Sequence, residues 1–213
     1  MLNDWNEKEA ARAEKAWGKL MTFYTKDMFE FIYAPNEIIL DLGCGFGRFL
    51  DWIKKEKEIE DPPYFGYDSS ENMIERLLAK HPEYKLRIFL KDLTAPITHT
   101  ANAILISAVF IHITVEDQVK ILNSVLTLKP KRLSFDINCP NENAIDRLKI
   151  KQIEYTERWM KTKAGTSKFR MTYQSHHDMT RRILTQFTDY KLTTKFYTIR
   201  PDQHKVCYFL ERK

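Results

Sequence analysis

The residues that offer most chemistry lie in the stretch DLGCGFGR, from Asp41 to Arg48. It places Gly43, Gly45 and Gly47 at every second position, with an acid two residues before the first glycine. Glycine lets a backbone turn tightly and approach a ligand without a Cβ in the way, and a helix N-terminus presents free N–H donors. The stretch directly follows an apolar run and precedes a helical one, which is the context that makes such a pattern informative. We therefore interpret it as a ligand-binding loop.

The spacing of this loop also indicates which ligand it holds. The dinucleotide fingerprint needs a third glycine where this chain has Arg48, so NAD fits poorly. An acid at Asp41 suits a positively charged amino group better than a pyrophosphate. Asp68 follows Gly47 by 21 residues and ends the next expected strand, where a carboxylate can accept both hydroxyls of a ribose. A ligand with a ribose and a cationic group, such as S-adenosylmethionine, fits these residues.

The elements that must position this loop alternate along the chain. Amphipathic helical stretches separate five short apolar runs, which predict strands at 37–42, 64–67, 86–90, 103–108 and 133–137. Two further strands, 191–199 and 206–210, are joined by a connection too short for a crossover helix, so they must be antiparallel. The fold class predicted is α/β, a doubly wound, mostly parallel seven-stranded sheet with an antiparallel C-terminal hairpin, N-terminal helices and a cap insertion.

The length of 213 residues suits one domain with a real core. We divide it into an N-terminal helical cover (1–34), a cofactor-binding core (36–140), a substrate-cap insertion (141–175) and a last helix with the closing hairpin (176–213). Within the insertion we expect a helix over 141–161 and a strand over 169–174.

Around the glycine loop the sequence reads ILDLGCGFGRFL, and over about 36–140 and the terminal hairpin the chain resembles the class I S-adenosylmethionine-dependent methyltransferases, small-molecule branch. The resemblance implies that the glycine loop holds the methionine part of the cofactor. It implies that the acid ending the second strand binds the ribose, and that the residues after it and after the third strand meet the adenine. An aromatic residue of the N-terminal helix would close over the cofactor. The implied cofactor-binding residues are Tyr24, Asp41, Gly43, Cys44, Gly45, Gly47, Asp68, Ser69, Met73, Asp92, Leu93 and Ser107.

A second motif, Asp61-Pro62-Pro63-Tyr64, has the same four residues as the DPPY element of amino-methylating nucleic-acid enzymes but a different position in the fold. In that branch the element follows the fourth strand, where this chain reads SAVFIHI. Here it follows a charged helix end and leads into the second strand. Its prolines stop the helix and set the turn.

The reaction that the resemblance implies is an in-line methyl displacement, which needs alignment and exclusion of water more than catalytic groups. His112, just past the fourth strand, is our candidate base, because its ordinary pKa suits proton transfer near neutral pH. Packing or orienting the loop is an equal alternative. Phe110, Tyr173 and His176 are the candidate substrate contacts. The alternative is core packing for the two aromatic residues and an exposed, inert position at a helix start for His176. No His or Cys spacing predicts a metal site.

The composition indicates the cellular compartment of the protein and the kind of acceptor to test. No run reaches the roughly 18 apolar residues of a membrane span, the first ten residues do not resemble a secretory signal, and three scattered cysteines form no disulfide framework. We therefore expect a cytoplasmic protein. Residues 141–213 carry 16 Lys and Arg against 8 Asp and Glu. This excess either belongs to solvated helix faces or faces an anionic partner, so anionic small molecules are the acceptors to test first.

The predicted function is methyl transfer from S-adenosylmethionine, leaving S-adenosylhomocysteine, to an oxygen or nitrogen of a small molecule. Two alternatives stay open. An RNA or protein methyltransferase is supported by the basic C-terminal third but lacks an RNA-binding module. A non-catalytic cofactor-binding or partner-binding subunit is possible because fold does not fix function. The acceptor and the oligomeric state do not follow from the sequence.

Overall fold

A parallel sheet forms the centre of the protein, seen in a computed structural model that describes residues 6–17, 22–140, 155–161, 168–200 and 203–213. Five strands pair in parallel in the order β3-β2-β1-β4-β5. β9 pairs antiparallel with β5, and β8 pairs antiparallel with β9, which confirms the predicted closing hairpin. The bounds are β1 Ile39–Leu42, β2 Tyr64–Asp68, β3 Ile88–Leu90, β4 Ala103–Ile106, β5 Arg132–Pro140, β8 Tyr190–Arg200 and β9 Gln203–Arg212.

The order of these strands determines where a ligand can bind. β1 and β4 are buried along their whole length, as apolar strands covered on both faces should be. The chain runs outward from β1 through β2 to β3 and then crosses back to β4 on the other side of β1. In open α/β sheets this reversal of strand order opens a crevice at the carboxyl ends of the strands. The loops after β1 and β4 meet there.

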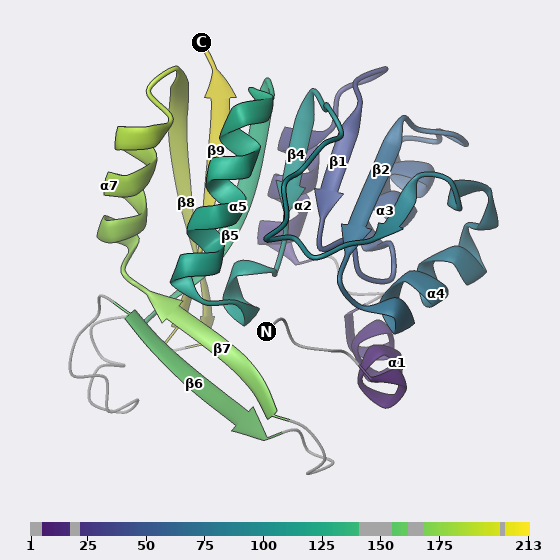
Figure 1. The fold of residues 1–213 in the computed structure, drawn as a ribbon, viewed down its shortest axis with the longest axis horizontal. Helices are drawn as coiled ribbons and strands as arrows, with labels where there is room; N and C mark the ends of the chain where they lie inside the picture. The colour runs from purple at the N-terminus through teal and green to yellow at the C-terminus, as the bar shows by residue number, and fades with distance from the viewer. Residues whose placement is uncertain (1–5, 18–21, 141–154, 162–167, 201–202) are drawn as a thin grey trace.

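Helices cover both faces of the sheet (Figure 1). One face packs under α5 and α7, and the other under α2 and α3, each with its own apolar core. The expected caps form, because Thr114 Oγ1 accepts from Asp117 N at 3.1 Å and Ser175 Oγ accepts from Asp178 N at 3.4 Å. The bounds are α2 Phe23–Ile32, α3 Arg48–Glu56, α4 Glu71–Lys80, α5 Val115–Leu128 and α7 His176–Gln186, with 3₁₀ turns η1 Pro82–Tyr84 and η2 Phe110–His112.

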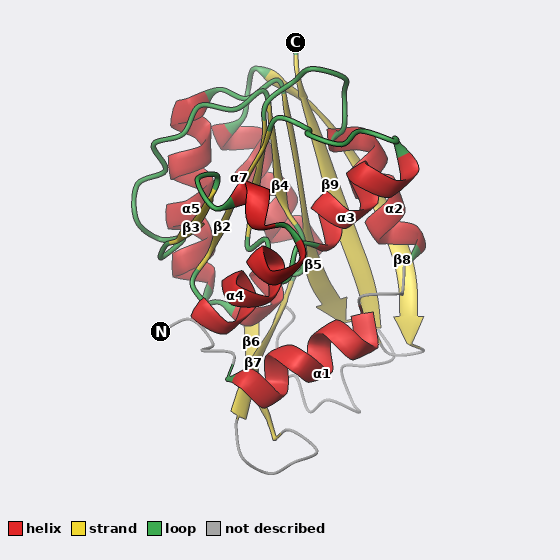
Figure 2. Ribbon diagram, turned by 90° about the vertical axis from the view of Figure 1, so that its right-hand side faces the viewer, coloured by secondary structure: helices red, strands yellow, loops and turns green. Residues whose placement is uncertain are grey.

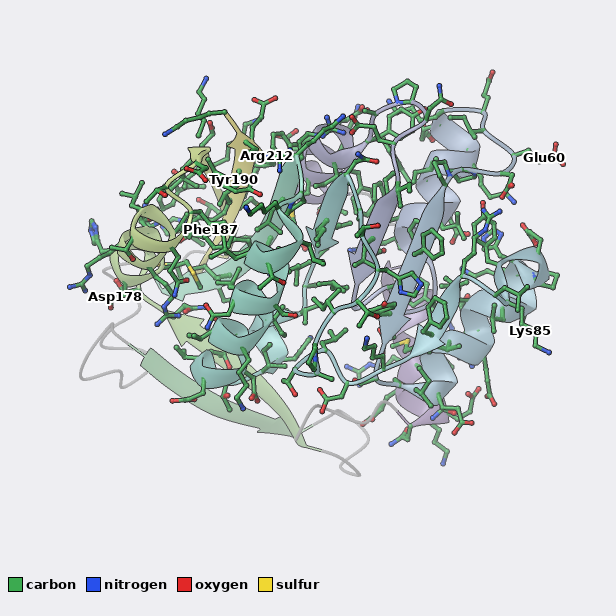
Figure 3. The ribbon with its side chains drawn as sticks, turned by 45° about the horizontal axis from the view of Figure 1, so that its top comes forward. Glu60, Lys85, Asp178, Phe187, Tyr190 and Arg212 are labelled. Atoms are coloured by element: carbon green, nitrogen blue, oxygen red, sulfur yellow. The ribbon has the colours of Figure 1, made fainter. Side chains whose placement is uncertain are left out.

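The closing hairpin is fixed where α7 passes into β8. Phe187 and Tyr190 pack edge to face at 5.6 Å, and both lie inside α7 and β8 in Figure 3, while Asp178 points outward. The Tyr190 hydroxyl donates to the Pro130 carbonyl oxygen at 2.6 Å, which ties β8 to the start of β5. Buried rings and one buried hydrogen bond therefore hold the edge of the sheet.

Two elements lie beyond the carboxyl edge of the sheet, α1 (Glu7–Trp17) and a hairpin of β6 (Tyr155–Lys161) and β7 (Lys168–Gln174). Figure 1 shows α1 below β2 and α4, and the hairpin below β5. β7 joins the sheet through a parallel pairing of Tyr173 with Asn138 near the end of β5. Together with these two strands the sheet has nine.

The hairpin corrects one expectation. Residues 155–161 form a strand rather than the end of a helix, because the stretch pairs along its full length with the strand predicted at 169–174. Its own sequence, YTERWMK, contains the aromatic and β-branched residues that favour strands. The rest of the expected helix, 141–154, lies outside the described residues.

Candidate active site

The glycine loop joins β1 to α3, and each of its glycines has a left-handed backbone, with φ of 81° at Gly43, 54° at Gly45 and 86° at Gly47. A Cβ at Gly43 would lie 2.2 Å from the Val109 side chain, and one at Gly47 would lie 2.9 Å from Leu77. Packing therefore requires these two glycines. A Cβ at Gly45 would meet nothing within 4 Å. Gly45 is the point of the loop that faces open space, where a ligand can approach the backbone.

Asp68, at the end of β2, holds this loop in place. Its Oδ2 accepts from Gly45 N at 2.8 Å and its Oδ1 accepts from Ser70 N at 2.9 Å. Burial raises the pKa of Asp68, and the backbone N–H donors oppose that rise. Ser69 is a third backbone donor to this carboxylate, whose two oxygens have four lone pairs in all. The carboxylate can therefore accept a further hydrogen bond from a ligand hydroxyl beside the open side of Gly45.

Asp41 lies deeper, within β1, and is 3% exposed. Its Oδ2 accepts from the Tyr64 hydroxyl at 2.7 Å. Burial raises the pKa of Asp41 from its ordinary 3.8 to about 7, with Tyr64 and Arg48 opposing the rise. The carboxyl group is thus balanced near neutrality between its protonated and ionised forms, behind the loop that a cationic ligand would occupy.

The DPPY segment lies away from this loop. Tyr64 begins β2, so the segment stands at the amino edge of the parallel sheet, whereas the glycine loop follows the carboxyl end of β1. Asp61 is ion-paired with Arg87 at 2.7 Å, and Figure 3 shows Glu60 pointing into solvent beside it. The motif's one contribution to the site is the Tyr64 hydroxyl on Asp41, which the sequence did not indicate.

The residues that the resemblance assigns to the adenine differ in their burial and in their contacts with the glycine loop. Met73, on α4, packs with Phe46 of the loop, and Ser69 precedes that helix, half-buried. Leu93 is buried and lies 3.8 Å from the place of a Cβ on Gly43. Asp92 is exposed, and its Oδ1 accepts from both the N–H and the hydroxyl of Thr94, so it shapes its own turn.

The Cys44 side chain packs against β2 and thereby supports the glycine loop. Its sulfur lies 2.8 Å from the place of a Cβ on Gly66, so the side chain fills a gap against β2. Burial raises the pKa of Cys44 well above that of an ordinary thiol. The N–H groups of Gly43 and Cys44 both donate to the Tyr67 carbonyl oxygen, at 2.7 and 3.0 Å. The thiol packs against β2, and a ligand contact at Cys44 stays a prediction.

A buried polar cluster joins the loop after β4, the strand β5 and the start of β9. Asp136 Oδ2 accepts from Lys205 Nζ at 2.5 Å, and its Oδ1 accepts from Ala108 N at 2.6 Å. Ala108 has a left-handed φ of 59°, which is strained for a residue with a side chain. The Tyr24 ring of α2 lies 5.5 Å from Lys205 Nζ. An ion pair thus fixes the loop after β4 and connects it to the predicted aromatic cover.

Two members of this cluster have polar atoms without partners. Asn138, directly across from Lys205 in the β5–β9 pairing, is 1% exposed, and neither its amide oxygen nor its amide nitrogen has a hydrogen bond. Ser107 Oγ is buried and unpaired as well. Such groups are costly unless a ligand or water satisfies them. Sequence reasoning missed Asp136, Asn138 and Lys205. The signal was the alternation in LSFDIN, where polar residues recur on one face of an otherwise buried strand.

The expected substrate-side residues are dispersed. His112 ends η2, half-buried, close to the start of α5. Phe110 is 0% exposed and packs on Phe135 at 5.2 Å in the core, which corrects its expected role as a substrate wall. His176 begins α7, where its Nδ1 bonds the Tyr208 hydroxyl at 3.0 Å, and its contact with a substrate stays a prediction. Tyr173 lies in β7, and its side chain is outside the described residues.

Hydrogen bonds fasten the β6–β7 hairpin to the loop that carries His112. Thr172 Oγ1 donates to the Ile113 carbonyl oxygen at 2.7 Å. Gln174 Nε2 donates to Gln118 Oε1 at 2.7 Å, and Gln118 Nε2 donates to the Phe110 carbonyl oxygen at 2.9 Å. The hairpin is therefore positioned over the carboxyl ends of β4 and β5 by buried polar contacts.

Other kinds of site have less support in the described residues. Across those segments, no group of three or more His, Cys, Asp or Glu is placed to hold a metal ion. A hollow of about 410 Å³ between α5, β7 and α7 includes none of the predicted site residues. In the part of the chain that the structure describes, no helix combines the length and apolar character that crossing a bilayer requires.

Comparison with known proteins agrees with this fold. Residues 40–129 match the family model of a methyltransferase domain. The fold is similar to magnesium protoporphyrin IX methyltransferase from Synechocystis PCC 6803 with bound S-adenosylhomocysteine (TM-score 0.65, 18% identity, 98% of this chain and 96% of that chain). It is also similar to DhpI in complex with S-adenosylmethionine and HEP (TM-score 0.64, 16% identity, 95% and 92%).

A third similar structure is phosphoethanolamine N-methyltransferase 2 of Haemonchus contortus with phosphomonomethylethanolamine and S-adenosylhomocysteine (TM-score 0.63, 10% identity, 97% of this chain and 57% of that chain). No curated protein matches the sequence. At these identities the solved structures show the fold, and the matched domain covers the glycine loop, Asp68 and the loop after β4.

Proposed function

Because the chain contains a methyltransferase domain with the class I, S-adenosylmethionine-dependent fold, we propose that it transfers the methyl group of that cofactor to an oxygen or nitrogen atom of a small-molecule acceptor. The observation that carries the proposal is the pairing of Gly45 with Asp68. Gly45 leaves open space where a side chain would stand, and Asp68 presents its carboxylate beside that space. A ribose with two hydroxyls fits these groups.

The residues that would hold the cofactor are the glycine loop, Asp68 and the α1 and α4 side chains around Phe46. The bound cofactor supplies an activated methyl group on a sulfonium. Asp41, behind the loop, is ionised by a nearby positive charge more readily than in its absence, so it favours a cationic ligand over a neutral one. Its role is electrostatic, since the carboxyl is buried within β1.

The chain's remaining task is to align the acceptor and exclude water. α1 lies on the β2 side of the crevice and the β6–β7 hairpin on the β5 side, so the methyl group would pass between two covered halves (Figure 1). His112 stands on the loop fastened to that hairpin and would take the proton from a hydroxyl acceptor. An acceptor that loses no proton before transfer needs no such base.

The polar cluster indicates the class of acceptor. Lys205 has further N–H donors beyond the one directed at Asp136, and the Asn138 amide and Ser107 hydroxyl add more. Donors that converge from three elements suit an acceptor with an anionic oxygen group. The Haemonchus contortus enzyme was solved with phosphomonomethylethanolamine, an acceptor of this kind. We therefore propose small acids, such as carboxylates and phosphate esters, as the acceptors to screen first.

The test is calorimetric titration with S-adenosylmethionine, S-adenosylhomocysteine and NAD, using wild type and Asp68→Ala. Saturable binding of the first two ligands and not NAD, weakened in Asp68→Ala, is the expected result. Equal affinity of the variant and wild type would remove the ribose assignment. A folded wild-type protein that binds neither cofactor form would contradict the proposed function and favour a partner-binding role.

A further inference from the structure

The helix α1 lies directly over the glycine loop and α4. Its Ala10 and Ala13 form a small apolar cluster with Phe46 of the loop and Met73 of α4. Figure 2 shows the helix crossing below α4, at the carboxyl edge of the sheet. Arg76 of α4 is bonded to Glu14 at 2.7 Å and also to Glu7, so ion pairs hold the helix from its outer side.

Glu9 lies on the inner side of this helix, one residue before Ala10 and one helical turn before Ala13. It is 7% exposed, and both of its carboxylate oxygens are buried without a hydrogen-bond partner. No ion pair with a cation of the described segments reaches it, in contrast to Glu14 on the same helix. A buried carboxylate is normally paired or hydrogen-bonded, because leaving water without compensation is costly.

The unpaired carboxylate therefore indicates a ligand that brings its own donors. Around Glu9 the helix contacts Phe46, which follows Gly45, and Met73, which lies in the first turn of the helix after Asp68. Both are on the side of the crevice assigned to the cofactor. The acceptor-side cluster of Asp136 and Lys205 lies on β5 and β9. The ligand nearest Glu9 would be the cofactor.

We propose that Glu9 is a direct cofactor-binding residue, whose carboxylate accepts hydrogen bonds from N–H or O–H groups of a cationic nucleoside and thereby closes α1 over it. The inference rests on the proposed function, since S-adenosylmethionine is that nucleoside. In the ligand-free protein the buried charge opposes the docking of α1, and the bound ligand relieves this cost. Glu9 thus lowers the stability of the free protein and raises its affinity for the cofactor.

Both effects, on stability and on affinity, can be measured in Glu9→Gln, with Glu14→Gln as the matched control from the same helix. Thermal unfolding without ligand and calorimetric titration with S-adenosylhomocysteine are run on both. Glu9→Gln is expected to unfold at a higher temperature than wild type and to bind about tenfold to a hundredfold more weakly, the range for a lost charged hydrogen bond. Glu14→Gln removes the charge of the Arg76 ion pair, so it is expected to unfold at a lower temperature with nearly unchanged affinity.

Hydrogen exchange over residues 7–17 gives a second readout. S-adenosylhomocysteine should slow exchange there in wild type and in Glu14→Gln, and much less in Glu9→Gln. Wild-type affinity in Glu9→Gln would overturn the inference while the proposed function stands. Lower stability of Glu9→Gln together with weaker binding would show that Glu9 only supports the helix, which also overturns it. Failure of wild type to bind the ligand would remove the proposed function itself.

Discussion

Replacing Asp41 with Asn tests how far burial controls the chemistry behind the glycine loop. Asp41 is almost fully buried and its pKa is raised from 3.8 to about 7. Between these two values the folded protein keeps a proton that the unfolded chain has released. The free energy of unfolding of wild type therefore falls as the pH rises through that window. Asparagine can still accept from the Tyr64 hydroxyl but cannot ionise, so Asp41→Asn escapes this loss.

The size of the effect follows from the shift. About three pKa units correspond to roughly 4 kcal/mol of unfolding free energy at 1.36 kcal/mol per unit. Asp41→Asn should match wild type near pH 4 and exceed its stability by this amount at pH 8. The gap should open progressively between these points and become constant above about pH 8, when the wild-type carboxyl is ionised in both states.

Urea denaturation of wild type and Asp41→Asn at half-unit steps from pH 4 to 8.5 measures this gap, and other titrating groups cancel in the difference. Asp61→Asn is the control, because the Arg87 hydrogen bond lowers the pKa of Asp61 on the surface, so that variant should show a small loss of stability with the opposite sign. A pH-independent difference for Asp41→Asn would refute the reasoning. It would mean that the carboxyl is ionised, and compensated, throughout.

Three further predictions follow from the site. Gly45→Ala should fold yet bind S-adenosylhomocysteine more weakly in calorimetry, because its methyl group enters open space, whereas Gly43→Ala should lower the unfolding temperature, because its methyl group meets a side chain at 2.2 Å. His112→Ala should keep cofactor affinity and lose turnover of a hydroxyl acceptor, and full activity would remove it as the base. Lys205→Met should cost about 3–5 kcal/mol in urea denaturation by stranding a buried charge, and adding Asp136→Asn should recover much of it.

The glycine loop and its sheet could be predicted from the sequence because both depend on local geometry. A strand, a glycine turn and a helix are contiguous, so Gly43, Gly45 and Gly47 specify their own conformation. The acid ending the next strand then lies beside the loop, because parallel strands bring their carboxyl ends to one edge, and Gly45 N does bond Asp68. The antiparallel hairpin followed in the same way from a connection too short for a crossover.

The structure of the substrate-cap insertion could be predicted less accurately than that of the sheet. Residues 155–161 pair with 168–174, and that pairing, rather than their own periodicity, makes them a strand. Phe110 shows the same limit on a smaller scale, since its place in the core depends on Phe135 in a strand more than twenty residues later. A sequence pattern states which face of an element is apolar, but not which neighbour covers it.

Whether a buried polar group has a hydrogen-bond partner cannot be predicted from the sequence, and in this protein the buried groups without a partner indicate where ligands bind. Glu9 and Glu14 are one helical turn and one residue apart on α1 and are chemically identical, yet one is bonded to Arg76 and the other is buried with both oxygens unpaired. Asn138 and Ser107 repeat the pattern at the acceptor end. Because unpaired buried groups destabilise the free protein, their gathering around one crevice is best explained by ligands that complete them. The unpaired Glu9 carboxylate suits a ligand that brings hydrogen-bond donors. The unpaired Asn138 and Ser107 groups, beside the Asp136–Lys205 ion pair, suit a second ligand with polar oxygen atoms.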